Sequence, residues 1–217
     1  MDKIAVFDFD KTCIAYDCEE TLFKVMLELD EVPTNTKLLI KDWIDSFVYP
    51  SVERCVYATK IFSWLVREDI VKWTKYMLTD PDLVVNNSVK ELYEDLTNKW
   101  YTIYIVTASL ADIVNIVAEH HGYKPKQIIG SMLEIKDGVY TTEILQLPCF
   151  DDKVTMIDKH VWQIPDICVW DSLNDMAMLY YSKQAYVIPS DDRIHPHIEE
   201  NNRILLEKNP WVHQENS

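Results

Sequence analysis

The sequence predicts an α/β protein with a doubly wound, mostly parallel sheet and a small all-helical cap domain inserted after the first strand. Three observations support this fold class. The apolar, β-branched run Lys3–Phe7 is typical of a buried parallel strand. Residues 14–87 show apolar positions at helical spacing and no clear strand. From about residue 88 onward, strand and helix patterns alternate, which indicates a sheet built from β-α units.

The first strand ends where the polar cluster Asp8 to Thr12 begins, so its carboxyl end carries acids. In the insert, helical spacing is clearest in two groups, Leu22, Val25, Met26 and Leu29, and Ile40, Trp43, Ile44, Phe47 and Val48. After the insert we expect a helix through Val89, Leu92 and Leu96 and then a strand from Thr102 to Val106. The next helix opens at Thr107 to Ser109 and runs through Ile113 to Ala118, and it is followed by a strand from Ile128 to Leu133 with a hairpin turn at Asp137-Gly138. The remaining predicted elements are a helix Lys153 to Val161, a strand Ile167 to Trp170, a helix Asp175 to Tyr181 and a strand Ala185 to Ile188. We therefore expect a Rossmann-like α/β core made of residues 1–13 and 88–217, and a helical cap domain made of residues 14–87.

Composition and charge narrow the function classes. The 217 residues are 48% apolar and 26% charged, which is globular usage and excludes a disordered or collagen-like protein. The 36 acidic and 21 basic residues give a net charge of −15, which disfavours nucleic acid and anionic membrane surfaces as partners. An acidic enzyme can still act on anions when a bound divalent cation reverses the field in its cleft.

Cysteines and apolar runs indicate the compartment. The five cysteines are odd in number and form no C-x-x-C pair, so we expect a reducing environment. The first apolar run is too short for a signal peptide, and no run approaches the ~20 residues that span a bilayer. We expect a cytoplasmic protein. Only three glycines occur, which excludes a glycine-rich phosphate loop.

Acidic side chains follow two of the predicted strands. Asp8 and Asp10 come directly after the first strand, and Asp171 and Asp175 follow the strand that ends at Trp170. Ligands of open α/β sheets bind outside the carboxyl ends of the strands, so these carboxylates are expected to lie close together. Carboxylates at such density repel one another unless they share a cation, and hard oxygen ligands favour Mg²⁺. Taken singly, each Asp could equally be a helix cap.

A hydroxyl and an amine complete the predicted constellation. Thr107 ends another strand, with backbone amides at the start of the expected helix that form a seat for an anion. Lys153 opens a later helix and is expected to approach from the far side. Carboxylates, a metal, a hydroxyl and an ammonium together suit phosphoryl transfer to a nucleophilic Asp, with a second Asp moving a proton.

The order of these motifs resembles that of a known superfamily. D-x-D-x-T at Asp8, Asp10 and Thr12, then Thr107-Ala108-Ser109, Lys153 and Asp171 to Asp175, is similar to the four motifs of the haloacid dehalogenase superfamily of phosphohydrolases. The chain looks like the phosphoserine phosphatase branch, which carries a helical cap directly after the first motif. The segments at 129–141, 174–179 and 187–190 are similar as well.

The resemblance implies roles for the motif residues. Asp8 would be the nucleophile, and Asp10 would be the general acid for the leaving group and then the general base for water. Mg²⁺ would be held by the Asp8 carboxylate, the Asp10 backbone carbonyl and Asp171, with Asp175 orienting Lys153 or a water on the metal. The dehalogenases of the superfamily lack the second acid, so Asp10 points to phosphate chemistry. The residues expected to grip the phosphoryl oxygens are Thr107 and Lys153.

The resemblance also suggests substrate contacts. Asp17 stands where the phosphoserine enzymes carry a Glu that recognises the substrate amine. Ala108 and Ser109 replace the Gly-Gly of those enzymes, as in relatives that act on other phosphomonoesters, and Asn174 belongs to the fourth motif. For the cap cation that binds a substrate carboxylate, the candidates Arg54, Lys60 and Arg67 stay open.

The sequence therefore predicts a magnesium-dependent phosphomonoesterase acting on a small phosphorylated metabolite. A phosphotransferase or mutase with the same Asp nucleophile is an alternative, because the motifs do not separate transfer to an alcohol from hydrolysis. A non-catalytic phosphate-binding protein, or a signalling module like a response-regulator receiver, is another. His195 and His197 are expected at the surface without a metal. The oligomeric state and the individual substrate stay open.

Overall fold

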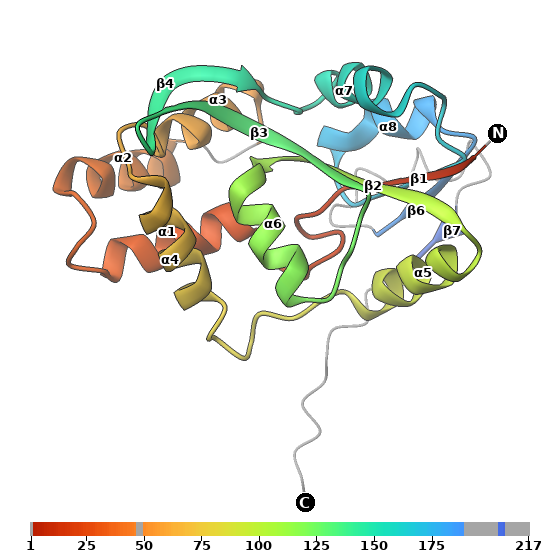
Figure 1. The fold of residues 1–217 in the computed structure, drawn as a ribbon, viewed down its shortest axis with the longest axis horizontal. Helices are drawn as coiled ribbons and strands as arrows, with labels where there is room; N and C mark the ends of the chain where they lie inside the picture. The colour runs from red at the N-terminus through yellow and green to blue at the C-terminus, as the bar shows by residue number, and fades with distance from the viewer. Residues whose placement is uncertain (1, 47–49, 189–203, 207–217) are drawn as a thin grey trace, which may run out of the picture.

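The computed structural model of the chain describes residues 2–46, 50–188 and 204–206. Its centre is a seven-stranded sheet in the order β4-β3-β2-β1-β5-β6-β7, in which β3 and β4 pair antiparallel and all other neighbours pair parallel (Figure 1). The strands are β1 (Lys3–Phe7), β2 (Tyr101–Leu110), β3 (Gln127–Lys136), β4 (Val139–Gln146), β5 (Ile167–Trp170), β6 (Gln184–Val187) and β7 (Ile204–Leu205). The predicted α/β class with a mostly parallel sheet is confirmed.

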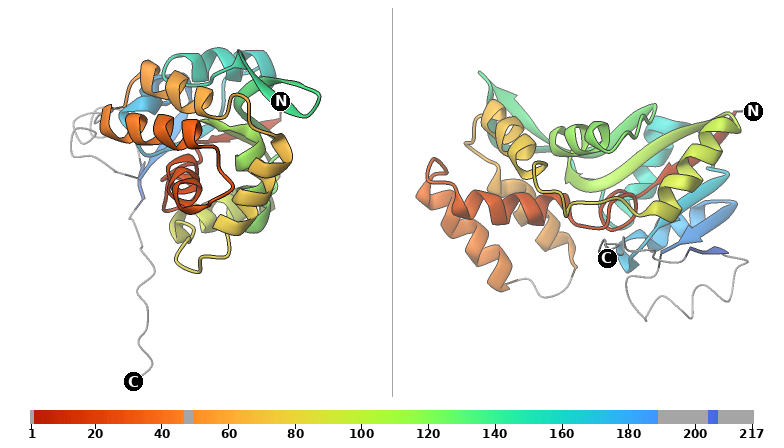
Figure 2. Two further views of the ribbon diagram at one scale, coloured as in Figure 1. Left: turned by 90° about the vertical axis from the view of Figure 1, so that its left-hand side faces the viewer. Right: turned by 90° about the horizontal axis from the view of Figure 1, so that it is seen from below.

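Helices cover the sheet and extend beyond one end of it (Figures 1 and 2). The α-helices are α1 (Cys18–Glu28), α2 (Thr34–Ser46), α3 (Val52–Ile61), α4 (Arg67–Met77), α5 (Asn87–Asn98), α6 (Ala111–His120), α7 (Asp152–Val161) and α8 (Met176–Tyr181), and a 3-10 turn, η1, spans Leu173–Asp175. The first four lie together at the left of Figure 1, away from β6 and β7. Within the described residues, no helix is long and apolar enough to span a bilayer. The sequence expectations for Phe47, Val48, Ser190, His195 and His197 fall outside the described residues.

The central strand shows why this sequence packs as two layers of helix around a sheet. Successive side chains of a strand point to opposite faces. Ile4 and Val6 of β1 pack in one apolar cluster with α7 and α8, whereas Ala5 and Phe7 pack in another with α5 and α6. Both faces of β1 are buried, as a parallel strand at the middle of a doubly wound sheet requires.

The four helices after β1 share their apolar interior with one face of the sheet. Their inward residues, among them Leu22, Phe23 and Trp73, belong to the same buried cluster as Phe7 of β1. Phe23 packs edge-on to Trp43, with ring centroids 5.3 Å apart. The helical segment is therefore anchored to the sheet by continuous burial of apolar side chains.

The chain enters and leaves the helical segment at one point. Ile14 and Val85 form an antiparallel bridge, and the Ala15 amide donates to the Val84 carbonyl at 2.9 Å. The Asn86 side-chain amide donates to the backbone carbonyls of Lys11 at 2.9 Å and Thr12 at 2.7 Å. One buried amide thus ties the return of the chain to the loop that carries the first acidic motif.

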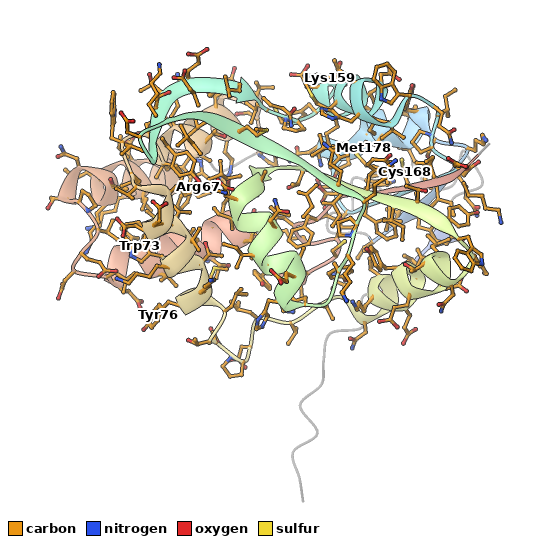
Figure 3. All side chains as sticks on the ribbon, viewed as in Figure 1. Arg67, Trp73, Tyr76, Lys159, Cys168 and Met178 are labelled. Atoms are coloured by element: carbon orange, nitrogen blue, oxygen red, sulfur yellow. The ribbon has the colours of Figure 1, made fainter. Side chains whose placement is uncertain are left out.

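The hairpin of β3 and β4 reaches over to the helical segment, which the sequence did not indicate. The predicted turn at Asp137-Gly138 is present, with both residues at positive φ. The Trp64 amide donates to the Tyr140 carbonyl at 2.8 Å. Arg67 of α4, which is labelled in Figure 3, binds the Asp112 carboxylate of α6 through two hydrogen bonds of 2.9 and 2.6 Å. The hairpin and α6 together fasten α4 to the sheet.

The helix expected to open at Thr107 begins later. The strand β2 continues to Leu110, which pairs with Ser131 of β3, and α6 starts at Ala111. Side chains satisfy the amides at this point: Thr107 Oγ1 accepts from the Ser109 amide at 3.1 Å, and a Glu19 carboxylate oxygen accepts from the Leu110 amide at 2.6 Å. The predicted helix start is therefore wrong, and the amides of Ser109 and Leu110 are not free amides of a helix.

Gly130→Ala is expected to lower the free energy of unfolding by about 2–4 kcal/mol. A Cβ on Gly130 would lie 2.8 Å from the Ser109 carbonyl oxygen, which is backbone and cannot move aside as a side chain can. Urea unfolding measures the change. Gly138→Asn is the control, because it carries only the strain of a positive φ (+80°), which Asn tolerates better than most residues, and a Cβ there would meet the Glu68 carboxylate at an ordinary 3.7 Å. Equal, small effects of both substitutions would contradict the close approach.

Candidate active site

A pocket of about 840 Å³ lies beyond the carboxyl ends of β1, β2 and β5, between the sheet and the helices α1 and α3. Ligands of open α/β sheets bind at this edge. The predicted site residues that line it are Asp8, Asp10, Asp17, Thr107, Ala108, Ser109, Lys153, Asp171, Asn174 and Asp175. Every site residue predicted from the sequence thus borders a single pocket, although the role of each stays a prediction.

Three buried carboxylates meet on the sheet side of the pocket. Oxygens of Asp8, Asp171 and Asp175 lie within 4.8 Å of one another. Asp8 is fixed by β1, and its amide donates to the Val169 carbonyl of β5 at 2.8 Å. The Thr12 hydroxyl lies 3.1 Å from Asp8 Oδ2 and 3.2 Å from Asp171 Oδ1. The pairing of β1 with β5 therefore brings acids from the two ends of the chain together.

Lys153 supplies one positive charge to this cluster. Its Nζ lies 2.6 Å from Asp8 Oδ1 and also contacts Asp175 Oδ1, and the side chain is almost fully buried. Burial opposes the charged ammonium, but the carboxylates of Asp175 and Asp8 outweigh it and raise the pKa of Lys153 above its ordinary value. Burial and the charges of Asp175 and Asp171 raise the pKa of Asp8, against the effect of Lys153.

The chemistry of the donor set fits a divalent cation. Three carboxylates facing one ammonium leave an excess of negative charge in a buried place, which a cation of charge two would balance. The donors are all oxygens, as Mg²⁺ prefers. The side chain of Asp10 is not among them, and its predicted contribution is the backbone carbonyl.

The Asp10 side chain is turned toward the other side of the pocket. Its Oδ1 accepts from the Cys18 amide at 2.7 Å, at the first turn of α1. Its Oδ2 accepts from the Ser109 hydroxyl at 2.7 Å and lies 3.3 Å from the Thr107 hydroxyl. These donors hold the carboxylate in one orientation at the boundary between the sheet and the helical segment.

Asp17 caps α1 at the edge of the pocket. Its Oδ1 accepts from the Glu20 amide at 2.9 Å, and Lys11 Nζ lies 3.7 Å from Oδ2. Burial and the nearby Asp10 charge raise the pKa of Asp17 to about 6, despite the opposing effects of Lys11 and the amide. Asp17, which the sequence predicts to bind a substrate amine, is therefore also the N-cap residue of α1.

Of the three cap cations considered from the sequence, Arg54 lines the pocket, whereas Lys60 and Arg67 do not. The guanidinium carbon of Arg54 lies 3.9 Å from the centre of the Trp43 ring, and Trp43 borders the pocket too. Glu20 approaches Arg54 at 3.9 Å. The helical wall of the pocket thus offers the Arg54 cation beside the acid Glu20.

Glu19 is a pocket residue that no sequence motif singles out. It is buried, lines the pocket and accepts from the Leu110 amide at 2.6 Å. Burial raises its pKa well above the usual range, and the amide only partly offsets this. In sequence it is an ordinary acid in the first turn of a helix, and only packing of α1 against β2 reveals its partner.

Asp17→Asn is expected to raise the free energy of unfolding at pH 7 by about 1–2 kcal/mol. Asn keeps the helix cap, whereas the wild-type carboxylate loses a proton at a folded pKa of about 6, above its ordinary value. A raised pKa means that the penalty is absent below about pH 4 and complete above pH 6. Urea unfolding from pH 4 to 8 should show wild type and variant diverging over that window; parallel curves would contradict the shifted pKa.

Comparisons with known proteins found a family model and solved structures that are similar to this chain. A family model described as haloacid dehalogenase-like hydrolase matches residues 5–180. No curated protein sequence matches the chain. A crystal structure of a protein of unknown function from Bordetella pertussis Tohama I is similar at a TM-score of 0.80, with 13% identity over 96% of this chain and 100% of that one.

Phosphoserine phosphatase structures are similar as well. A substrate-bound complex matches at a TM-score of 0.62, with 17% identity over 97% of this chain and 94% of that one. The enzyme from T. onnurineus matches at 0.63, with 14% identity over 96% and 90%. At these identities the likeness concerns the fold.

Proposed function

The chain belongs to the haloacid dehalogenase-like hydrolase family, and from that premise we propose that it is a magnesium-dependent phosphomonoesterase that forms an aspartyl-phosphate on Asp8. The observation that carries the proposal is the buried cluster of Asp8, Asp171 and Asp175 with Lys153 at the floor of the pocket. Its charge and oxygen donors suit both a divalent cation and a phosphoryl group bound beside it.

Each step assigns a task to a residue of this chain. An Asp8 carboxylate oxygen attacks phosphorus, the bond to the ester oxygen breaks, and Asp10 donates a proton to the leaving alcohol. Asp10 then takes a proton from a water that attacks the aspartyl-phosphate, which releases inorganic phosphate and restores the Asp8 carboxylate. Lys153 and the Thr107 hydroxyl hold phosphoryl oxygens. Mg²⁺, held by Asp8, Asp171, the Asp10 carbonyl and with help from Asp175, would neutralise charge that develops on the phosphoryl group.

The substrate is a small phosphorylated metabolite held by the helical segment. We assign residues 14–87 to a cap and residues 1–13 and 88–217 to the catalytic core, with the crossing at Ile14 and Val85 as the connection between them. The substrate contacts assigned to the pocket are Asp17, Ala108, Ser109 and Asn174, beside Thr107 and Lys153. Closure of the cap excludes water while the ester is cleaved.

Release of inorganic phosphate from a panel of small phosphomonoesters tests this function. We expect turnover in Mg²⁺, loss in chelator and recovery when Mg²⁺ is added back. Esters that carry an amine should rank above matched esters without one, because Asp17 and Glu20 lie at the pocket. Alcohol acceptors in the same assay separate hydrolysis from a phosphotransferase or mutase, since transfer yields a new ester in place of phosphate. Magnesium binding without turnover of any ester would contradict the enzyme and favour a phosphate-binding or signalling module.

A further inference from the structure

Two cysteines from distant parts of the chain meet at the wall of the pocket. Cys55 lies on α3, Cys149 lies between β4 and α7, and both line the pocket. Their thiols are hydrogen-bonded to each other. All five cysteines are free. Since α3 belongs to the assigned cap and Cys149 precedes Lys153 on the core side, the pair bridges the two walls of the pocket.

Cys55 is half-buried and Cys149 is only 2% exposed, but both border the pocket. Cys13, Cys18 and Cys168 are completely buried, and burial is the main cause that raises the pKa of each. The hydrogen bond with Cys55 lowers the pKa of Cys149, helped by the Lys153 charge and opposed by burial and Asp152. The same bond raises the pKa of Cys55. Cys149 is therefore the better nucleophile of the two, because the thiolate is the reactive form.

We propose that Cys55 and Cys149 are an oxidation site, at which a peroxide converts the two thiols into a disulfide that joins α3 to the segment before α7. The Cys149 thiolate attacks a peroxide oxygen, the O–O bond breaks, and the products are a sulfenic acid and, with one proton, water. The Cys55 sulfur then attacks the sulfenic sulfur, the S–O bond breaks and a second water leaves with the remaining proton. One hydrogen peroxide is reduced to two waters, and two thiols are oxidised.

Both thiols lie where a disulfide between them could form. Neighbouring thiols at one wall of the pocket have to approach each other to the ~2.05 Å S–S length of a disulfide. Both side chains border the pocket of about 840 Å³, from which hydrogen peroxide would reach the half-buried Cys55 and the nearly buried Cys149. The bond would tie the cap to the core four residues before Lys153.

The effect on activity rests on the proposed function. A cap that is bonded to the core cannot separate from it to exchange substrate and product, so oxidation should lower turnover by about tenfold or more. Reduction with dithiothreitol should restore it.

The experiment treats the full chain with hydrogen peroxide and measures free thiols, phosphate release and the masses of peptides digested without reductant. We expect the five thiols to fall to three, with one cross-linked peptide that contains Cys55 and Cys149. Cys55→Ser and Cys149→Ser should each lack that peptide, and in each the ratio of oxidised to reduced activity should stay near one. Cys168→Ala, which removes a thiol from the far apolar cluster, should retain the cross-link.

The outcomes separate the oxidation site from the proposed function. Thiol loss without a Cys55 to Cys149 peptide would overturn the site. A fully formed cross-link with unchanged turnover would overturn its control of the cap. A cross-link in a protein that is inactive even when reduced would support the site and count against the phosphomonoesterase, because the peptide mass does not depend on catalysis.

Discussion

Asp8→Asn is expected to lower phosphate release by at least about 10³-fold, the scale of losing a nucleophile. Asn has nearly the same shape, so the residue can occupy the same place after β1 while lacking the charge that attacks phosphorus. Asp8 is one of three buried carboxylates that repel one another, and its own burial and the charges of Asp175 and Asp171 raise its pKa. Removing its charge should therefore not destabilise the fold. Steady-state turnover and thermal unfolding of the same preparation check both statements.

The matched control for this variant is Asp30→Asn. Asp30 is exposed in the turn after α1 and lies outside the pocket. Its replacement should leave turnover within about twofold, because surface substitutions of this kind have small effects. Turnover of Asp8→Asn within tenfold of wild type would remove Asp8 from the role of nucleophile.

Lys153→Met is expected to lower the free energy of unfolding by about 3–5 kcal/mol, the cost of breaking a buried ion pair from one side. The Lys153 ammonium is the charge that Asp8 and Asp175 both contact. Met fills a similar volume, but it leaves Asp8 and Asp175 without the positive charge of the ammonium. Urea unfolding measures the change, and Mg²⁺ should return part of it by replacing the lost positive charge.

The dependence of this loss on pH follows from the pKa shifts. The pKa of Lys153 is raised, so its stabilisation is present throughout neutral pH and would be lost only at strongly alkaline pH. In the variant, Asp8 lacks the ammonium that opposes the rise of its pKa, so it takes up a proton more readily and the variant gains stability relative to wild type as pH falls. The difference between the two proteins should therefore shrink between pH 7 and pH 4.

Lys159→Met on the same helix is the control for Lys153. Lys159 is exposed on α7 (Figure 3), so its replacement should change the free energy of unfolding by no more than about 0.5 kcal/mol. If the two substitutions cost the same, the buried ion pair contributes little.

The parts of the fold that could be predicted from sequence are those set by local pattern. The apolar run of β1 and the polar residues at its end are properties of neighbouring positions, and the same holds for β5 and the acids that follow it. This local pattern is sufficient to place Asp8 and Asp171 at one edge of the sheet. The β-α order of the later elements has the same origin.

The rest depends on contacts between distant residues. The Leu110 amide bonds to Glu19, which keeps β2 extended where local signals favoured a helix. The choice of Arg54 as a pocket cation depends on how α3 packs, because a cation on a helix face looks the same whether it points to solvent or to a cavity. The meeting of Cys55 and Cys149 likewise requires the hairpin to bring the segment after β4 beside α3.

The central place of β1 in the sheet has a consequence for how the site is assembled in time. Lys3 of β1 pairs with Tyr101 of β2, and Ala5 of β1 pairs with Ile167 of β5. The ribosome therefore synthesises the two partner strands of β1 about 100 and 160 residues after β1 itself. At about 20 residues per second, the second interval lasts about 8 s. The residues of helices α1 to α4 are synthesised before either partner strand, β2 or β5. Because Asp171 follows β5, the cluster of Asp8, Asp171 and Asp175 forms only when β5 pairs with β1, late in the synthesis of the chain.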